Sequence, residues 1–407
     1  MTLKGTPIGT GFTVIVPTRE RADTLVHCLR TLTTQDYANL RILVSDNCSN
    51  DDTRAVVESV DDPRIMYVNP GRRLSMAHHW EYALSHVSDG WVMFVGDDDG
   101  LCPGAIGQLN ELISQSSVEA ITAAYSVFVW PGHMRSHPTG KLVVPLGRGA
   151  AVRSTKHELR RALAGEIPYS NLPWLYNGGT ASIRAINAAR GADGRFFRAQ
   201  TPDLYSAVAL SLSLDRYLSV ATPIAVGGTS RHSTGASTVH TNSQDEKGAA
   251  LRYASEDNIP FHKDLILGKS VDIVLYECYL QARHLHVPGF EVTIGKQLQF
   301  AVDSTTSNLR SQTLDECRRM AEMHGTPPPT PRAGLRFRLS RLVSSLRRVM
   351  NRYSVDPGRL GIRDVFGAAQ ATTAIHATAT KRPLFRLLTI PRELVLVLFA
   401  RRARSAR

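Results

Sequence analysis

The sequence predicts an α/β fold in which a mostly parallel sheet carries helices on both faces. Over the first 130 residues, short runs of β-branched and aromatic residues alternate with segments of helical periodicity. Polar loops follow these runs, and a hydrophobic fraction of 43% is ordinary for a globular protein with a sizeable core. Strands that alternate with helices are typical of a parallel sheet covered on both sides.

The predicted elements follow one another in regular order. Leu25, Leu29 and Leu32 share one face of the first helix, and Pro103 stands in the first turn of the fourth. The expected strands are 12–17, 41–46, 64–68, 91–95 and 120–130, and the expected helices are 22–35, 51–60, 74–87, 103–115, 156–165, 201–214, 270–286 and 311–323, with a turn-rich entry and helix at 171–191.

Four parts are expected along the chain. Residues 1–130 form the first half of a catalytic domain, and residues 131–324 form its second half with further helices. The Pro-rich stretch GTPPPTPRAG, 325–334, predicts a linker, and residues 335–407 form a helical, basic C-terminal extension. Residues 331–407 hold 17 Lys and Arg against 3 Asp and Glu, whereas the remainder holds 31 basic and 33 acidic residues, so the high net charge belongs to the tail.

Composition argues against several classes of protein. The N-terminus lacks the apolar stretch of a secretory signal, and no run of about 18 apolar residues predicts a membrane-spanning helix. Five cysteines show no CxxC spacing, which predicts reduced thiols, no zinc site and no disulfide framework. These observations predict a cytoplasmic protein. The cysteines are Cys28, Cys48, Cys102, Cys278 and Cys317.

An acidic run follows the predicted strand 91–95. Asp97, Asp98 and Asp99 stand side by side, and near an apolar core their mutual repulsion and burial would push each pKa upward. A divalent cation with a phosphate-bearing ligand would relieve this repulsion. A solvated turn is the alternative, but the position after a buried strand favours metal binding.

Three polar loops are expected to converge. Ligands of open parallel sheets bind beyond the carboxyl ends of the strands, where this sequence has PTRERADTL, SDNCSNDDT and GDDDGLCPG. The first loop lacks the GxGxxG fingerprint, and no GKS or GKT loop occurs in the chain. Phosphate charge would therefore be balanced by a metal on the acidic run.

The segments VIVPTRERADTL, LVSDNCSNDDT and FVGDDDGLCPGAI resemble the signature blocks of the family 2 glycosyltransferases, which have a GT-A, Rossmann-like fold; RFFRAQTPDLYSAVAL, 195–210, resembles a later block. The resemblance implies a nucleotide-sugar-binding half over 1–130 and an acceptor-side half over 131–324. It places Pro17, Thr18 and Arg19 around the base and ribose, and Asp46 on the base, usually uracil. Asn47 replaces a frequent second acid.

The resemblance also assigns the acidic run to the family's DXD motif. In the family one aspartate meets the ribose and another meets Mg²⁺ or Mn²⁺ on the diphosphate. Asp97 and Asp98 are therefore assigned to the donor, and Asp98 and Asp99 to the metal. Gly96 replaces the first acid of the usual DxDD pattern. Side-chain alternation in an extended segment would instead pair Asp97 with Asp99.

Sugar transfer also needs a base on the acceptor side. A divalent ion stabilises the leaving diphosphate, and a carboxylate within hydrogen-bond reach deprotonates the attacking hydroxyl. Asp203, in the block TPDLYS, is the candidate base. The alternative is an acid in the first turn of a helix, where the helix dipole favours it.

Three further sites have both a functional and an ordinary explanation. His232, with Arg231 in GGTSRHSTG, is a candidate metal ligand or loop residue over the leaving group; a surface histidine is the alternative. Arg73 is a candidate for the donor phosphates, against a solvated arginine. The segment around Trp174 and Tyr176 is a candidate acceptor wall, against ordinary packing.

The basic tail has two interpretations of similar weight. Residues 335–353 place leucines on one helical face with arginines around them, and residues 381–407 repeat the pattern. Such helices suit peripheral contact with anionic lipids; packing against the catalytic body is the other interpretation. Nucleic-acid binding is not expected, because the tail lacks interleaved aromatic residues.

These observations together predict a metal-dependent, inverting glycosyltransferase. Its donor would be a nucleotide sugar, with UDP-sugars favoured, and its acceptor a glycan or lipid-linked glycan of the cell envelope. The protein would act in the cytoplasm, with peripheral contact on the inner face of the plasma membrane through 335–407. A nucleotidyltransferase, or a non-catalytic protein that binds membrane or nucleic acid through its tail, are the alternatives.

Overall fold

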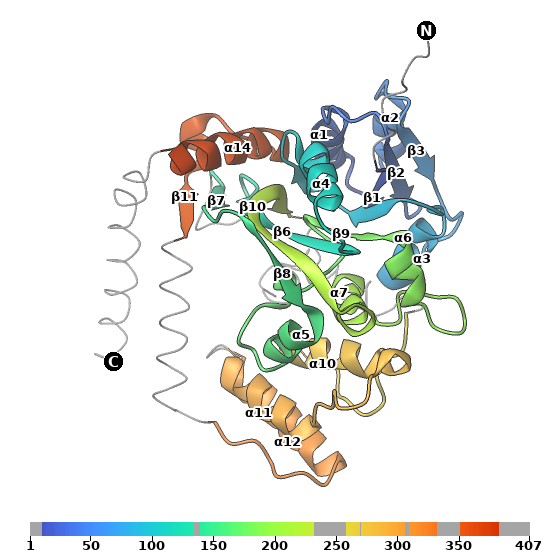
Figure 1. Ribbon diagram of the computed structural model, residues 1–407, viewed down its shortest axis with the longest axis vertical. Coiled ribbons are helices and arrows are strands. Elements are labelled where there is room, and N and C mark those ends of the chain that lie inside the picture. Colours follow the sequence, from blue (N-terminus) through green and yellow to red (C-terminus); the bar gives the residue numbers. More distant parts are fainter. Residues whose placement is uncertain are drawn as a thin grey trace.

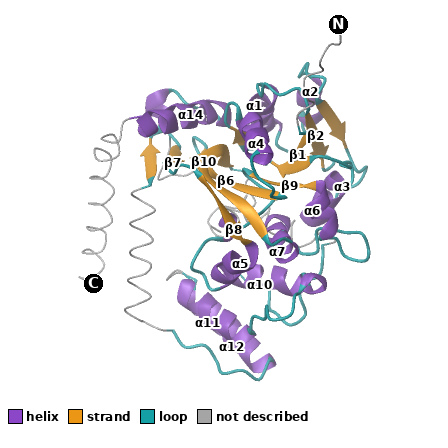
Figure 2. Cartoon of the chain, viewed as in Figure 1, coloured by secondary structure: helices purple, strands orange, loops and turns teal. Residues whose placement is uncertain are grey.

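A single sheet runs through the molecule, with helices on both faces (Figures 1 and 2). The computed structural model describes residues 10–133, 139–231, 258–268, 270–305, 309–331 and 351–381. Eight strands follow the order β11-β7-β6-β9-β4-β1-β2-β3, and β10 joins β6, β5 and β8 to this sheet. The predicted α/β class with flanking helices is therefore confirmed.

The first four strands form the parallel part of the sheet. They are β1 (Phe12–Thr18), β2 (Leu40–Asp46), β3 (Ile65–Val68) and β4 (Trp91–Phe94). The β1 strand lies between β2 and β4 and is parallel to both, and β3 extends the sheet beyond β2. The carboxyl ends of β1, β2 and β4 consequently meet at one edge, as the sequence predicts.

Beyond β4 the sheet is mixed. The short strand β9 (Gly179–Ser182) inserts antiparallel between β4 and β6 (Ala120–Val129), so β6 does not continue the parallel order. A long strand, β10 (Arg216–Thr229), runs parallel to β6 with register shifts near Pro223. The remaining strands β5 (Gly100–Leu101), β7 (Lys141–Pro145) and β8 (Ala150–Ser154) pair antiparallel with their neighbours.

One face of the sheet is covered by α1 (Ala22–Thr33), α2 (Thr53–Glu58) and α4 (Ala105–Ser114). Leu25 and Leu29 of α1 and Leu109 of α4 are fully buried with Val14 and Val16 of β1 in one apolar cluster. The regular spacing of these leucines is what makes each helix lie flat on the strands.

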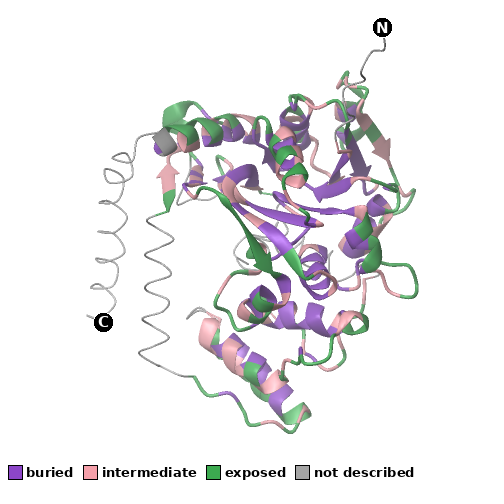
Figure 3. Ribbon diagram, in the orientation of Figure 1, coloured by how far each residue is buried: buried purple, intermediate pink, exposed green. Residues whose placement is uncertain are grey.

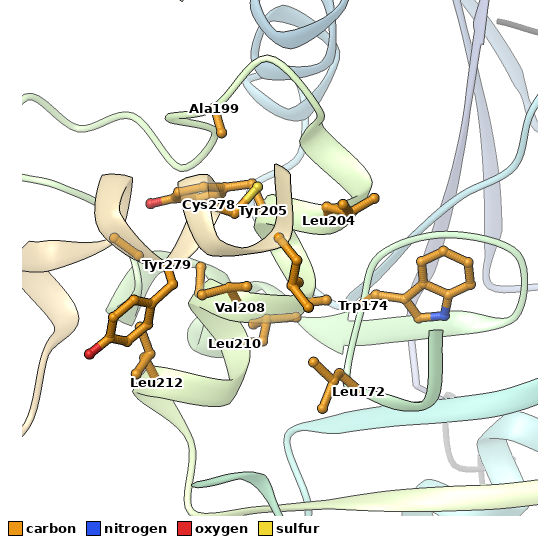
Figure 4. Close-up of a cluster of buried hydrophobic side chains, with 14 of the residues drawn as sticks. Leu172, Trp174, Ala199, Leu204, Tyr205, Val208, Leu210, Leu212, Cys278 and Tyr279 are labelled. Carbon is orange, nitrogen blue, oxygen red and sulfur yellow. The ribbon is translucent and has the colours of Figure 1, made fainter. Parts of the chain in front are cut away.

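The opposite face carries α3 and most of the later helices. They are α3 (Met76–Leu84), α5 (Thr155–Leu163), α6 (Ile183–Ala188), α7 (Pro202–Ser213) and α10 (Val271–Gln281), with α11 (Ile294–Ser304) and α12 (Arg310–Met323) at the far end, and short 3-10 turns at η1 (Tyr169–Asn171) and η2 (Arg283–Leu285). Every residue of α7 from Leu204 to Leu212 is buried, which makes this helix the centre of the second half (Figure 3). Cys278 and Tyr279 of α10 and Trp174 belong to the same apolar cluster (Figure 4).

The C-terminal segment is partly a component of this body. The strand β11 (Arg352–Val355) pairs antiparallel with β7, and after η3 (Pro357–Leu360) the helix α14 (Val365–Lys381) packs on the outer strands. Val365 and Ala368 are buried with Phe128 and Leu142, because these apolar side chains fill the face of α14 that meets the sheet.

The predicted helical C-terminal extension thus contains the helix α14, which is preceded by the strand β11, and both elements pack on the sheet. The two most basic stretches, 335–349 and 382–407, lie outside the described residues, so the membrane-surface interpretation stays a prediction. Within the part of the chain that the structure describes, no helix is both long enough and apolar enough to cross a bilayer.

Candidate functional site

The acidic run forms a tight, buried turn after β4. The Asp99 amide donates to the Gly96 carbonyl at 3.0 Å, and the three aspartates are 1–4% exposed. A Cβ at Gly96 would lie 2.5 Å from Asp99 Oδ2 and 2.7 Å from the Tyr176 hydroxyl, so an acid cannot fit there without a local shift. Because residues 96–99 turn, the alternation that would pair Asp97 with Asp99 does not apply.

Asp97 is paired with a cation from the start of α1. Arg21 Nη1 lies 2.8 Å from Asp97 Oδ1. Burial and the neighbouring charge of Asp98 raise the pKa of Asp97, and Arg21 opposes this. Burial alone would lower the pKa of Arg21, but the charges of Asp97 and Asp98 raise it overall. Sequence reasoning missed Arg21, although it stands in the quoted loop PTRER.

Asp99 is held by main-chain donors. Its Oδ1 accepts from the Gly228 amide at 2.6 Å, and its Oδ2 accepts from the Gly96 amide at 3.0 Å. Burial, together with the charge of Asp98, raises the pKa of Asp99 to about 8. In this arrangement both carboxylate oxygens of Asp99 already have donors, so it is less suited to bind a metal than its neighbours.

Asp98 is the central charge of the turn. Its charge raises the pKa of both Asp97 and Asp99. Asp98 Oδ2 accepts from the Ser230 hydroxyl at 2.7 Å, and its carbonyl oxygen accepts from Trp130 Nε1 at 3.1 Å. Ser230 follows β10 directly, so the end of this strand closes one side of the acidic turn.

Asp46 lies at the end of β2 and faces β3. Its Oδ1 accepts from the Ser49 amide at 2.9 Å, and its Oδ2 accepts from the Tyr67 hydroxyl at 2.6 Å. Beneath this loop, His79 Nε2 lies 2.9 Å from the Ser45 hydroxyl, and burial lowers the pKa of His79 to about 4. The imidazole is therefore neutral at physiological pH, and its role here is to support the loop.

Two of the predicted donor-binding residues brace the loops. The Asn47 side chain accepts from the Leu74 amide at 2.8 Å and donates to the Leu74 carbonyl at 2.7 Å. Arg73 pairs with Glu20, which has a positive φ of 56° in the loop after β1. These contacts use the polar atoms of Asn47 and tie the segment after β3 to the first two loops.

The predicted residues at the end of β1 lie where the acidic turn and the Asp46 loop meet. Pro17 and Arg19 are half-buried, and Thr18 is buried. Thr18 is opposite Asp46 in the parallel register, and the charge of Arg19 helps to lower the pKa of His79. These three residues are thus within the site region.

The structure brings Asp203 to the same region as the acidic turn. Asp203 is half-buried in the first turn of α7, and burial raises its pKa to about 6. Tyr176 connects the two: burial raises the pKa of its hydroxyl, and the charges of Asp99, Asp98 and Asp203 raise it further. The Tyr176 hydroxyl is therefore near both the acidic turn and the candidate base.

An aromatic group surrounds this junction. Trp174 lies edge-on to Tyr169 and Tyr176, with ring centroids 5.7 and 5.6 Å apart. Tyr169 also hydrogen-bonds Asp203. Trp174 and Asn177 are buried, so the predicted acceptor wall is largely a packed layer, and only Tyr169 and Tyr176 are partly exposed.

Several buried polar atoms here lack a hydrogen-bond partner. Such groups cost about 1–3 kcal/mol each and are usually satisfied by water, an ion or a ligand. The atoms of this kind that belong to the acidic turn and its neighbours are Thr18 Oγ1, Asp97 Oδ2, Trp174 Nε1 and Asn177 Oδ1.

Glu81 of α3 anchors the segment that leads to Asp203. Glu81 Oε2 accepts from the amides of Phe196 and Phe197 at 2.9 and 2.8 Å, and Oε1 lies 2.7 Å from Arg190 Nη1. The sequence offered no signal for this role, because an acid within an amphipathic helix usually faces solvent.

Few protein side chains at the acidic turn are available to bind a divalent ion. Among the described residues, no group of three or more His, Cys, Asp or Glu side chains is arranged to hold a metal. Mg²⁺ in transferases commonly takes one or two carboxylates and completes its shell with water and phosphate oxygens. Asp98 and the unpartnered Oδ2 of Asp97 suit that mode of binding. His232 lies outside the described residues; its neighbour Arg231 pairs with Asp23 at 2.9 Å.

The N-terminal part of the chain, which holds the acidic turn, matches a known protein family. Residues 13–160, which contain β1 to β4 and the acidic turn, match the model of the glycosyl transferase family 2. These residues form a family 2 glycosyltransferase domain. Tyr176, Asp203 and Ser230 lie beyond the matched range, so the site described above extends past the recognised glycosyltransferase domain.

Two curated proteins resemble part of the chain. A Campylobacter jejuni protein named GalNAc(5)-diNAcBac-PP-undecaprenol beta-1,3-glucosyltransferase is 37% identical over 101 residues, 24% of this chain and 33% of that protein. An uncharacterised Mycobacterium tuberculosis protein is 29% identical over 105 residues, 26% of this chain and 33% of that protein. The similarity to these relatives thus spans about a third of their length.

Solved structures show only a distant likeness. The structure of Staphylococcus aureus TarS 1–349 in complex with UDP-GlcNAc is 15% identical, with a TM-score of 0.45, and the likeness covers 78% of this chain and 92% of that one. At this score the likeness does not support an argument about the glycosyltransferase site.

Proposed function

We propose that this protein is a metal-dependent glycosyltransferase that moves a sugar from a nucleotide sugar to an acceptor hydroxyl with inversion. The single observation that carries the proposal is the placement of Tyr176, whose hydroxyl feels the charges of both the acidic turn and Asp203. A diphosphate site and a carboxylate base near one another are what a direct displacement at a sugar carbon needs.

The donor would lie along the carboxyl ends of β1, β2 and β4. Asp46 and the half-buried Pro17 and Arg19 form the base and ribose end. Asp98, with Asp97, would hold Mg²⁺ or Mn²⁺, and this ion would neutralise the leaving diphosphate. Thr18 and the unpartnered oxygen of Asp97 supply polar atoms at the same place. UDP-sugars are favoured, in keeping with the resemblance of the Asp46 block.

Asp203 would act as the base for the acceptor. Its pKa of about 6 leaves the carboxylate ionised near neutral pH while keeping it basic enough to take a proton. As the acceptor oxygen bonds to the sugar carbon, the bond to the donor phosphate oxygen breaks and the hydroxyl proton moves to Asp203. One displacement with one base inverts the configuration at that carbon.

A lipid-linked or envelope glycan is the proposed acceptor. The Campylobacter jejuni relative carries an undecaprenol-linked acceptor in its name, and it shares 37% identity over its matched part. Tyr169 and Tyr176 are partly exposed aromatic residues, a type of side chain that suits a sugar ring.

A panel of UDP-, GDP- and other nucleotide sugars, each with Mn²⁺, Mg²⁺ or EDTA, tests the proposal. We expect one donor to raise the melting temperature only with metal and to release a nucleoside diphosphate. The Asp98→Asn variant should lose both effects. Release of pyrophosphate would indicate nucleotidyl transfer instead, and no response to any donor with either ion would reject the enzyme.

A further inference from the structure

The main chain of Asp98 is held from outside the acidic turn. Trp130, directly after β6, donates its indole N–H to the Asp98 carbonyl at 3.1 Å. Gly228 lies against the same atoms: a Cβ there would be 1.9 Å from the Asp98 oxygen and 2.8 Å from Trp130 Nε1. The Asp98 peptide is therefore wedged between the indole and β10, and its position depends on where Trp130 lies.

Trp130 is packed in turn by α1 and the start of α14. The His27 ring of α1 lies edge-on to Trp130, with centroids 5.8 Å apart. His27 Nδ1 is 3.1 Å from Asp364 Oδ2, which is within ion-pair distance. The angle between these two groups does not meet the geometry of a hydrogen bond. The other oxygen of Asp364 accepts from the Gly367 amide at 2.8 Å, so the same carboxylate caps α14.

Two more contacts fix the orientation of α14. The Arg30 guanidinium of α1 lies over the Phe366 ring at 4.3 Å, the geometry of a cation–π contact. Deeper in the fold, the Thr372 hydroxyl donates to the buried Ser126 hydroxyl at 3.0 Å. The helix is thus attached both to α1 and to β6, the strand that ends just before Trp130.

We propose that the C-terminal element β11–α14, residues 352–381, positions the donor site. It acts through His27 and Trp130 on the main chain of Asp98, and so tunes the affinity of the acidic turn for a metal-bound diphosphate. This inference rests on the proposed function. Trp130 is a positioning residue, because its contact is with the Asp98 backbone. The element lies wholly outside residues 13–160, so the family domain alone would lack this support.

Two conservative variants of the full chain test the inference. Trp130→Phe keeps an aromatic ring and removes the N–H that holds the Asp98 carbonyl. Asp364→Asn keeps a good helix cap and removes the charge that faces His27. Asp356→Asn is the matched control, since Asp356 also caps a turn of the C-terminal segment, by accepting from the Gly358 amide at 2.9 Å, and pairs with Arg359 at 3.9 Å.

Two measurements report on positioning. The first is amide hydrogen exchange of residues 96–100 in the ligand-free protein, and the second is the Kd for UDP in saturating Mn²⁺. We expect Trp130→Phe to speed exchange in the turn and to raise the Kd about 2- to 12-fold, as for the net loss of one hydrogen bond. Asp364→Asn should act in the same direction and more weakly, and Asp356→Asn should stay within twofold.

The outcomes separate the two proposals. Parent-like exchange at 96–100 and a Kd within twofold in both variants would overturn the inference, even if Asp98→Asn abolishes UDP binding. Faster exchange in a protein that binds no nucleotide would leave the positioning intact and reject the proposed function. If Trp130→Phe loses its cooperative melting transition, the hydrogen exchange and the Kd of Asp364→Asn decide the test.

Discussion

Asp203→Asn should stabilise the protein while it abolishes sugar transfer. The carboxylate is half-buried at the start of α7, where burial raises its pKa from 3.8 to about 6. Asparagine has the same shape and no charge, so the variant removes the cost of holding a carboxylate there. A residue retained for reactivity is expected to show this opposition between stability and activity.

The magnitude follows from the shift. About two pKa units at about 1.4 kcal/mol each give an upper limit of about 3 kcal/mol. The carboxylate also accepts from the Leu204 amide and the Tyr169 hydroxyl. Asparagine keeps only one acceptor oxygen for these donors, so we expect a net gain of about 1–2 kcal/mol.

The sign of the pH dependence is fixed by linkage. The unfolded carboxyl ionises near 3.8 and the folded one near 6, so the native state binds more protons between these values. The parent therefore loses stability as pH rises through this window, and the full cost is present above it. The advantage of Asp203→Asn should consequently be larger at pH 8 than at pH 4.5.

Urea unfolding of parent and variant at both pH values measures this difference. Asp193→Asn is a control for which the opposite change in stability is expected. Burial would raise the pKa of Asp193, but hydrogen bonds from Arg195 and Arg198 lower it overall. In the transfer assay, kcat should fall about 10²- to 10⁴-fold, and the rise of kcat/KM near pH 6 should disappear. An equal effect on stability at both pH values would refute the burial argument, and turnover within tenfold of the parent would refute the assignment of the base.

Three other perturbations have expected outcomes. Gly228→Ala would place its Cβ 1.9 Å from the Asp98 carbonyl, so it should destabilise the protein by about 1–3 kcal/mol in urea unfolding; Gly107→Ala, with open space on α4, should be neutral or stabilising. Glu81→Gln weakens the link to Arg190 and should lower kcat more than it raises the donor Kd; an unchanged kcat would contradict its anchoring role. EDTA should abolish the donor-induced thermal shift, and Mn²⁺ should restore it; a shift that persists in EDTA would argue against the metal.

The parallel half of the fold could be predicted because its signals are local. Each of β1, β2 and β3 is followed by a helix, and α4 follows β4 after the two-residue strand β5; β1, β2 and β3 lie side by side in sequence order, and β4 is next to β1. The rest depends on pairings across long stretches of sequence. Nothing in the GTAS segment of β9 indicates that it inserts between β4 and β6. The packing of residues 352–381 on β7 and β10 was likewise not predicted, because the arginine-rich stretches on either side indicated a surface helix.

The site was predicted by residue type but not by role. The three adjacent aspartates looked equivalent, whereas the fold gives each a different partner: Arg21 for Asp97, Ser230 for Asp98, and main-chain amides for Asp99. Apart from the Gly96 amide within the turn, these partners come from two distant segments, the loop after β1 and the end of β10, which meet only in the folded chain.

The aromatic segment around Tyr176 was predicted for a different reason from the one the structure shows. The sequence suggested a wall for sugar rings. The nearness of its hydroxyl to both the acidic turn and Asp203 depends on the long-range pairing of Tyr176 with Phe94, just before β9. No periodicity in the sequence carries that information.

The double contact of Glu81 with the amides of Phe196 and Phe197 has a consequence for engineering. A hybrid that exchanges the acceptor half for that of a relative, with a junction anywhere between α3 and Phe196, would separate this carboxylate from the two amides that it fits. Residues 81 and 190–197 should therefore be taken from the same parent protein, so that Asp203 keeps its position in the hybrid.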